Sequence, residues 1–262
     1  MNAAVRILRF ELEEVRRSRA VLVYGLFLLA VTEALLRFGG GGPRAVVSLL
    51  NVVLMLVPLV SVVFGTMHLY AAREFTELLL VQPIGRRTLY TGLFTGLVLP
   101  LAAAFVLGVG LPFLWHGAFA GAAGPVATLL AAGVLLTAVF TGAAFAAANR
   151  FDDRAKGLGT GILAWLALTV GYDAILLFIV MAWGDYPIET PLLVVSLLNP
   201  VDAARIALLL QLDTSALLGY TGAAFSHLLG AGVGYLVAGL ALAVWAAIPA
   251  WVGWRVFRRK DF

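Results

Sequence analysis

Residues 88–149 read TLYTGLFTGLVLPLAAAFVLGVGLPFLWHGAFAGAAGPVATLLAAGVLLTAVFTGAAFAAAN and contain no Asp, Glu, Lys or Arg. A transmembrane helix needs about 20 apolar residues to cross a hydrocarbon core about 30 Å thick. As a single helix this stretch would be about 93 Å long, or roughly three bilayers. It must therefore turn back on itself, and the glycine-rich segment 115–125 is the predicted turn. The stretch predicts two consecutive membrane spans.

The composition of the whole chain supports the same class. Of its 262 residues, 62% are hydrophobic and 12% are charged, whereas a soluble domain has about 25% charged residues. So few charges cannot cover the surface of a soluble globule, which excludes a cytosolic enzyme. The chain has no cysteine, which excludes disulfides, thiolate metal sites and cysteine nucleophiles. The predicted fold is an all-α membrane protein.

We predict a single transmembrane domain over residues 1–262 with six spans. The last charge-free run, 214–254, is longer than one span and barely long enough for two. An even number of spans places the basic C-terminus with the other basic segments, so only its second half is assigned as a span. Residues 214–231 are then either re-entrant or extracytoplasmic. The spans lie at about 20–38, 45–70, 88–114, 126–149, 158–183 and 232–255, with an outer segment at 184–231.

The basic residues predict the orientation of these spans. With both termini on one side, that side receives all of the 18 Lys and Arg residues except Arg37, Arg44 and Arg205. Basic residues collect at the cytoplasmic ends of spans. We therefore expect a multi-pass protein of the inner (plasma) membrane with cytoplasmic N- and C-termini. Because the basic residues mark membrane edges, nucleic acid is not an expected partner; the lipid bilayer is.

An amphipathic helix is predicted before the first span, over residues 4–19. Apolar side chains recur there at helical spacing, at Val5, Leu8, Leu12 and Val15. Such a helix lies in the membrane interface as an elbow. A signal peptide is the alternative, but the glutamates of this segment do not suit its basic, acid-free start.

Two short charged loops connect spans on the cytoplasmic side. The first, residues 69–87, reads LYAAREFTELLLVQPIGRR, with Glu74 and Glu77 one helical turn apart. It predicts a short amphipathic helix with exposed acids, which either docks into a groove of a soluble partner or is an interfacial connector without a partner. The residues alone leave these two interpretations open. The second loop, NRFDDRAKG at 149–157, is equally compatible with a solvated turn.

The segment after the fifth span carries a further helix signal. Asn199 is a candidate N-cap and Pro200 a first-turn residue for a helix that ends near Leu210. Asp202 and Arg205 interrupt its apolar face, so it is too short to be a span. We expect it to lie flat on the outer surface or to pack over the span ends. Its two charged side chains are candidate contacts for an outer partner.

The order of these segments and three motifs resemble the type-2 permease family of ABC transporters. The motifs are RE-x-x-x-LLL-x-QPIGRR at 73–87, YDAILLF at 172–178 and LLNPVDAARIALLL at 197–210. The last two resemble the members that support copper-site maturation of nitrous oxide reductase. The resemblance implies a homodimer bound by two ABC ATPase subunits, which hold ATP and Mg²⁺, and it allows a periplasmic accessory protein. It makes residues 72–85 the coupling helix and implies an ATPase-coupling role for Arg73, Glu74, Glu77, Gln82, Arg86 and Arg87.

Polar residues inside predicted spans are candidate sites because they are costly in lipid. We single out Glu33, Asn51 and Asp173. Glu33 lies four residues before Arg37, which favours a local ion pair. Asp173 is near the middle of its span, where it either lines a translocation path or dimer interface, or forms a hydrogen bond with a neighbour such as Asn51 or Thr169.

Neither a metal site nor an enzyme is expected from the sequence. Met55 and Met67 are about 18 Å apart along one span, too far to share a soft ion. There is no GxxxxGK[ST] phosphate-binding loop, so the chain needs a separate subunit for ATP hydrolysis and has no cofactor of its own. No catalytic residue is assigned. The alternatives are a permease for another small or lipidic cargo, a membrane assembly factor that does not transport, and an intramembrane enzyme.

Overall fold

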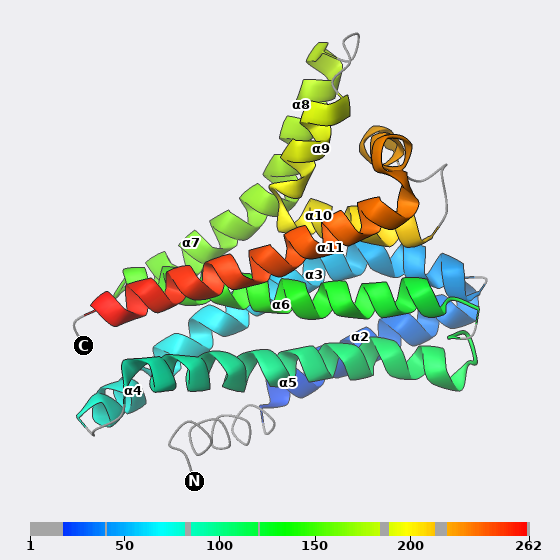
Figure 1. Ribbon diagram of the computed structural model, residues 1–262. Coiled ribbons are helices and arrows are strands. Elements are labelled where there is room, and N and C mark those ends of the chain that lie inside the picture. Colours follow the sequence, from blue (N-terminus) through cyan, green and yellow to red (C-terminus); the bar gives the residue numbers. More distant parts are fainter. Residues whose placement is uncertain are drawn as a thin grey trace.

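The computed structural model describes residues 18–39, 41–81, 85–119, 121–183, 189–212 and 219–260, and these form helices without a strand (Figure 1). Within them, six helices are long and apolar enough to cross a membrane, which confirms the predicted all-α membrane fold with six spans. The predicted elbow helix lies almost entirely outside the described residues. The six are α2 (Arg19–Phe38), α3 (Gly42–Ala71), α5 (Arg86–Trp115), α6 (Ala123–Arg150), the combined helix Arg154–Trp183, and Gly232–Arg259 of the last helix.

The long charge-free stretch forms α5 and α6, which pack against each other. Between them the chain turns at Gly117, whose φ of 64° lies in the left-handed region that glycine adopts without strain. This turn lies inside the glycine-rich segment from which the sequence predicts the reversal.

Helix α6 is the centre of the bundle. It packs against α3, α5, α7 and α11, and 61% of its most apolar stretch is buried. Small residues allow these close approaches. A Cβ on Gly142 would lie 2.7 Å from the backbone nitrogen of Ala250 in α11. At this position the backbones of α6 and α11 are therefore in near contact.

The fifth span consists of α7 (Arg154–Leu166), a π-helical turn η1 (Ala167–Gly171) and α8 (Tyr172–Trp183). Helix α8 has no buried residue, and Figure 1 shows it leaving the bundle. Its large apolar side chains are exposed, among them Ile175, Leu177, Phe178 and Met181. A contiguous apolar surface of this kind is unfavourable in water, so we expect this face of α8 to contact lipid or another protein.

Two short helices follow, α9 (Glu189–Leu197) and α10 (Pro200–Gln211). Asn199 is the N-cap of α10, and its side chain accepts a hydrogen bond from the backbone of Val201. Every residue of α10 except Arg205 and Gln211 is buried, because the helix packs against α6 and α11.

The corner between α9 and α10 lies against the fifth span and α11. The Asn199 side chain donates to the carbonyl of Leu168, 2.7 Å away, at the middle of the fifth span. Trp245 of α11 donates to the carbonyl of Leu197 over 3.2 Å. A 12-residue helix is too short to cross a bilayer, but it can enter one when its polar groups find partners, as those of α10 do.

The last helix, α11, runs from Gly219 to Arg259 and has 41 residues. At 1.5 Å per residue it is about 61 Å long, twice the hydrocarbon thickness. Figure 1 shows its first part turned sharply against the rest, and the part that qualifies as a span is Gly232–Arg259. Residues 219–231 are thus helical, whereas 214–218 lie outside the described residues.

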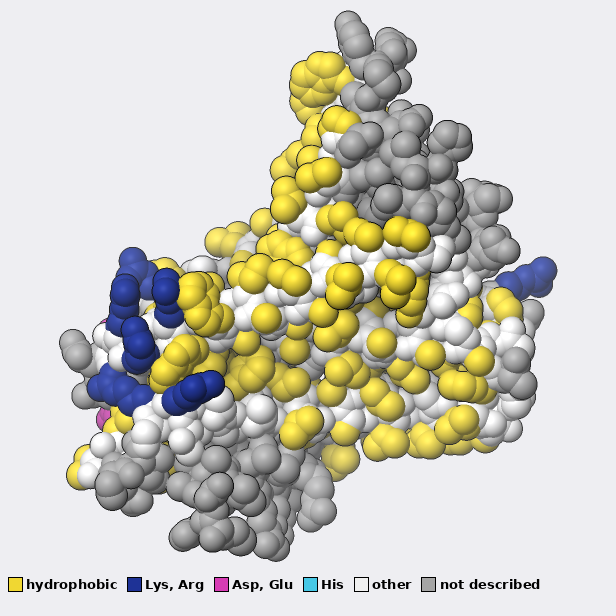
Figure 2. All heavy atoms as spheres, in the orientation of Figure 1, with side chains coloured by type: hydrophobic (Ala, Val, Ile, Leu, Met, Phe, Trp, Pro, Cys, Tyr) yellow, Lys and Arg dark blue, Asp and Glu magenta, His cyan; other side chains and the backbone are white. Residues whose placement is uncertain are grey.

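The two ends of the bundle differ in charge. We call the end that holds α4 (Arg73–Leu80), the start of α5 and the last turns of α6 and α11 the basic end. Figure 2 shows Lys and Arg side chains gathered at that end, next to a surface of apolar side chains over α11. The opposite end holds Glu33, Arg37, Arg44 and His116. The basic end carries Arg73, Arg86, Arg87, Arg150, Arg154, Lys156, Arg255, Arg258, Arg259 and Lys260.

Candidate functional site

Helix α4 presents an exposed stripe at the basic end. Glu74, Glu77, Leu78 and Val81 are all exposed, and Leu78 keeps 70% and Val81 87% of its surface. Their spacing of i, i+3, i+4 and i+7 places them on one side of a helix. Thr76 faces the opposite way and is buried. An acidic and apolar stripe with this spacing is suited to a groove of a partner, and we call these four residues the α4 stripe.

Arg73, at the start of α4, points away from the stripe and toward the second inner loop. Its Nη2 lies 3.1 Å from Oδ1 of Asp152, and its guanidinium lies 5.3 Å from the ring centre of Tyr70. The Tyr70 hydroxyl donates to the carbonyl of Phe151 over 2.8 Å. These contacts fasten the base of α4 to the loop between α6 and α7.

The end of α11 reaches the same loop. Lys260 Nζ lies 3.0 Å from Oδ1 of Asp152. Arg86, at the start of α5, donates to the carbonyls of Arg258 and Lys260 over 2.8 and 3.0 Å. Three segments far apart in the sequence therefore meet at one carboxylate, and we call Arg73, Asp152 and Lys260 the Asp152 clasp.

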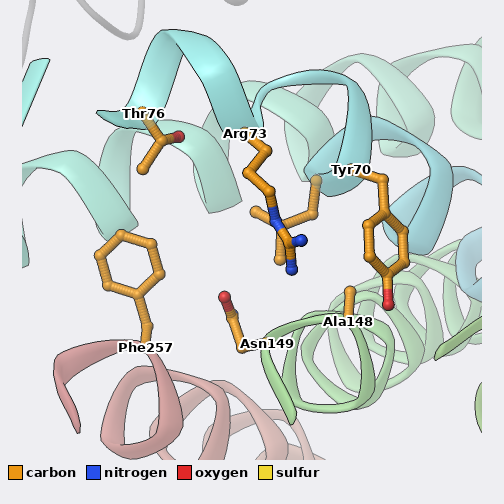
Figure 3. A pocket seen from close by; sticks show the side chains of 7 residues that line it. Tyr70, Arg73, Thr76, Ala148, Asn149 and Phe257 are labelled. Atoms are coloured by element: carbon orange, nitrogen blue, oxygen red, sulfur yellow. The ribbon is translucent and has the colours of Figure 1, made fainter. Parts of the chain in front are cut away.

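A small cavity lies beneath α4 (Figure 3). Its volume of about 10 Å³ is close to that which holds one water molecule. Oγ1 of Thr76 is buried there without a hydrogen-bond partner, and the amide of Asn149 donates to the carbonyl of Phe145 over 2.8 Å. The helix that carries the stripe thus sits over a partly polar cavity. The lining residues are Leu69, Tyr70, Arg73, Thr76, Ala148, Asn149 and Phe257.

The clasp has a consequence for the ionisation of its carboxyl group. The hydrogen bond from Lys260, together with the charges of Lys260 and Arg73, holds the pKa of Asp152 below its usual range. A depressed carboxyl pKa contributes stability above the unfolded pKa of about 3.9, and this contribution is lost as the pH falls through the folded value. Because the Asp152 side chain is exposed, water screens the effect, and the contribution to overall stability is small.

We expect Lys260→Met to raise the pKa of Asp152 toward about 3.9, since the first donor to the carboxylate is lost. The carboxyl carbon shift of labelled Asp152, followed by NMR against pH in micelles, measures it. Arg87→Met removes an exposed cation from the same end outside the clasp and should leave the titration unchanged. An unchanged midpoint in Lys260→Met would show that the clasp does not hold in solution.

The six residues that the sequence predicts for ATPase coupling divide into three groups. Glu74, Glu77 and Arg87 are exposed. Arg73 and Arg86 form contacts within the chain. Arg73 binds the loop between α6 and α7, and Arg86 binds the end of α11. Gln82 lies outside the described residues. Sequence reasoning missed Asp152, because the mixed-sign loop 149–157 is compatible with a solvated turn. It missed Lys260, because the basic residues near the C-terminus are interpreted only as markers of the membrane edge.

A second cluster of charges lies at the corner between α9 and α10. Arg205 donates to both carboxylate oxygens of Asp173, over 2.8 and 2.9 Å, and to Asp202 over 2.6 Å. Asp202 is 3% exposed, and Asn199 donates to its other oxygen over 3.0 Å. The bidentate geometry is the strongest form of an Arg–carboxylate pair. The cluster joins α10 to the fifth span.

The π-helical turn η1 lies next to this cluster. Asn199 donates to the carbonyl of Leu168 inside η1, and Asp173 is the second residue after the turn. The hydroxyl of Tyr172 donates to the carbonyl of Val195 in α9. Single π-helical turns occur often at functional sites, and here the turn places Asp173 against Arg205.

This arrangement differs from the partners that the sequence suggests for Asp173. Its carboxylate binds Arg205, whereas Asn51 is exposed on the surface of α3 and Thr169 donates to Trp165 of its own helix. Asp202 and Arg205 both have partners inside the chain, and a contact with an outer partner stays a prediction. Sequence reasoning missed Asn199 as a member of the cluster, although its spacing of three residues to Asp202 and of three more to Arg205 is a signal for one helix face.

Glu33 forms a third group at the opposite end. Its Oε1 lies 2.6 Å from Nε of Arg37, the i+4 pair that the sequence favours. Trp115 and His116, at the end of α5, approach the same carboxylate at 2.9 and 3.0 Å. The group ties α2 to α5. Across the described part of the chain, no set of three or more His, Asp or Glu side chains is placed to hold a metal ion.

Comparison with known proteins identifies two relatives. The chain is 28% identical to the probable ABC transporter permease protein NosY of Pseudomonas aeruginosa, with 97% of each chain covered. It is 27% identical to the probable ABC transporter permease protein NosY of Stutzerimonas stutzeri, with 99% of each covered. No protein-family model matches the chain. The resemblance predicted from the sequence is thus confirmed: over nearly its whole length, the chain is similar to ABC transporter permeases of the NosY type.

Proposed function

We propose that this protein is the permease subunit of an ATP-driven ABC transporter. The similarity to the NosY permeases over the full length supports this role, and so do the six apolar spans. The observation that carries the mechanism is the α4 stripe, which offers two carboxylates and two apolar side chains to a partner at the basic end. In this proposal the stripe docks into an ABC ATPase, which binds ATP and Mg²⁺.

The ion pairs at the start of α4 suggest how a displacement of α4 is transmitted to other helices of the subunit. Arg73 links the stripe to Asp152, and Lys260 links Asp152 to the end of α11. A displacement of α4 by the ATPase would therefore also displace the loop between α6 and α7 and the end of α11. We place the basic end on the cytoplasmic side of the inner membrane, because Lys and Arg collect on that side of membrane proteins.

A second copy of the chain completes the transporter in this proposal, with two ATPase subunits below. The apolar face of α8, which no other described helix buries, is available for packing against a second copy. For cargo, the resemblance favours support of nitrous oxide reductase copper-centre maturation, with a periplasmic accessory protein. Transport of another small or lipidic cargo, and assembly without transport, are the competing outcomes that a vesicle transport assay separates.

Charge reversal on the stripe tests the proposal. We expect Glu74→Arg with Glu77→Arg to weaken association with the ATPase of the transporter at least about tenfold, or ~1.4 kcal/mol, because a partner surface complementary to acids would repel two guanidinium groups. Co-purification and the stimulation of ATP hydrolysis in proteoliposomes measure the effect.

Lys156→Glu is the matched control, since it reverses an exposed charge at the same end outside α4. It should leave both readouts near those of the unmodified chain. If the double variant still co-purifies and stimulates hydrolysis fully, then α4 is not the coupling helix.

A further inference from the structure

A basic cavity opens between the last turns of α6 and α11. Its volume is about 280 Å³, and it is lined by Asn149, Arg150, Arg255, Val256, Arg259 and Lys260. Lys260 also binds Asp152, and the guanidinium of Arg255 lies 3.9 Å from the ring centre of Trp251. Within the described ranges, no carboxylate forms an ion pair with Arg150, Arg255 or Arg259. The cavity therefore collects positive charge that the described chain leaves without a counter-charge.

An apolar groove continues from this cavity toward the middle of the bundle. Its volume is about 410 Å³, and α6, α7 and α11 supply its walls. Arg150 and Val256 line both the cavity and the groove, so the two spaces adjoin. On α6 the groove extends from Ala143 to Arg150, about 10 Å at 1.5 Å per residue. Its walls include small residues such as Ala146 and Ala164.

We propose that the cavity and the groove together bind one anionic phospholipid. The headgroup phosphate lies among Arg150, Arg255 and Arg259, and an acyl chain lies in the groove along α6. Basic pockets between the ends of spans are suited to anionic headgroups, and an apolar groove that continues from such a pocket is suited to the acyl chain of the same lipid. This inference rests on the membrane fold and is independent of the transport proposal.

The joined shape distinguishes a lipid from other occupants. A free phosphate would use the cations and leave the apolar groove empty. An apolar face of a second copy would fill the groove and leave the guanidinium groups of Arg150 and Arg259 without counter-charge. A phospholipid with a negative headgroup matches both halves at once.

Competition between lipids tests the headgroup half. The purified chain, in micelles that contain equal amounts of phosphatidylglycerol and phosphatidylcholine, should retain phosphatidylglycerol at least about fivefold over phosphatidylcholine by native mass spectrometry. Arg150→Gln with Arg259→Gln should reduce this ratio to about one. Lys156→Gln with Arg258→Gln removes the same charge from exposed positions that do not line the cavity, and should keep the preference.

If both double variants lose the preference equally, the retention reflects only surface charge and the site is refuted. A chain that shows no preference for phosphatidylglycerol refutes it as well. Folding of each variant is checked by its elution as a single sharp peak in size-exclusion chromatography.

A second pair of variants tests the groove. Ala164→Phe places a ring in the groove and should reduce retention of phosphatidylglycerol at least about threefold. Leu163→Phe adds a ring at the adjacent position, which is 66% exposed and lies outside the groove, and should have no effect. Inorganic phosphate at millimolar concentration should not displace the lipid. Full displacement by phosphate, or a change in oligomeric state in Ala164→Phe with lipid retention unchanged, would overturn the proposal in favour of an anion or a second copy.

Discussion

Arg205→Leu is expected to lower the free energy of unfolding by about 3–5 kcal/mol. The guanidinium is the partner of Asp173 and Asp202 at once, and Asp202 is almost fully buried. Without it, two carboxylates would face each other in a site of low dielectric constant, where unpaired charge is most costly. Thermal unfolding in detergent and the yield of monodisperse protein measure the loss.

Two further variants make this result specific. Arg205→Lys keeps the charge but cannot form the bidentate pair, so its loss should be intermediate. Arg205→Leu combined with Asp173→Asn and Asp202→Asn removes all three charges, and it should recover much of the stability. If Arg205→Leu alone fails to fold, the triple variant still tests the argument. A single variant as stable as the unmodified chain would show that the cluster holds nothing together.

Gly142→Leu should have the second largest effect, a loss of about 3 kcal/mol or more. A Cβ at this position would lie 2.7 Å from the nitrogen of Ala250 and 2.9 Å from the carbonyl carbon of Pro249. Both are backbone atoms of α11, so no side chain can move aside, and the two helices must separate. The same unfolding measurement reports the loss.

Gly159→Leu is the matched control, because no heavy atom lies within 4 Å of a Cβ at that position of α7. The same change of residue type should there leave the free energy of unfolding unchanged or raise it slightly, because leucine has a higher helix propensity than glycine. Equal melting temperatures for the two variants would contradict the close contact between α6 and α11.

The spans could be predicted because lipid imposes a simple rule on the sequence. A charge-free run such as 88–149 must be helical and must turn where glycines permit, and the structure turns at Gly117. The start of α10 was equally predictable, since an Asn–Pro pair forms an N-cap with a proline in the first turn, and Asn199 does so. The acids of α4 are exposed, as the amphipathic pattern predicts. Each of these features depends on neighbours in the sequence.

The contacts of the sites could not be predicted, because they join distant segments. Arg205 and Asp173 are 32 positions apart, and the sequence offers many other pairs of opposite charge. The Asp152 clasp depends on how the ends of α6 and α11 meet, which no local pattern encodes. The segment ALTVG of η1 contains no residue that marks a π-helical turn.

That turn between α7 and α8 sets the rotational phase of the rest of the fifth span. Each residue added to or removed from an α-helix rotates all later side chains of that helix by about 100°. A span one residue shorter before Asp173 would direct its carboxylate away from Arg205, although its hydropathy would hardly change. Between Trp165 and Asp173 the length of this span is therefore as constrained as its composition. Single-residue deletions there should leave the span able to insert into the membrane but should break the ion pair between Asp173 and Arg205.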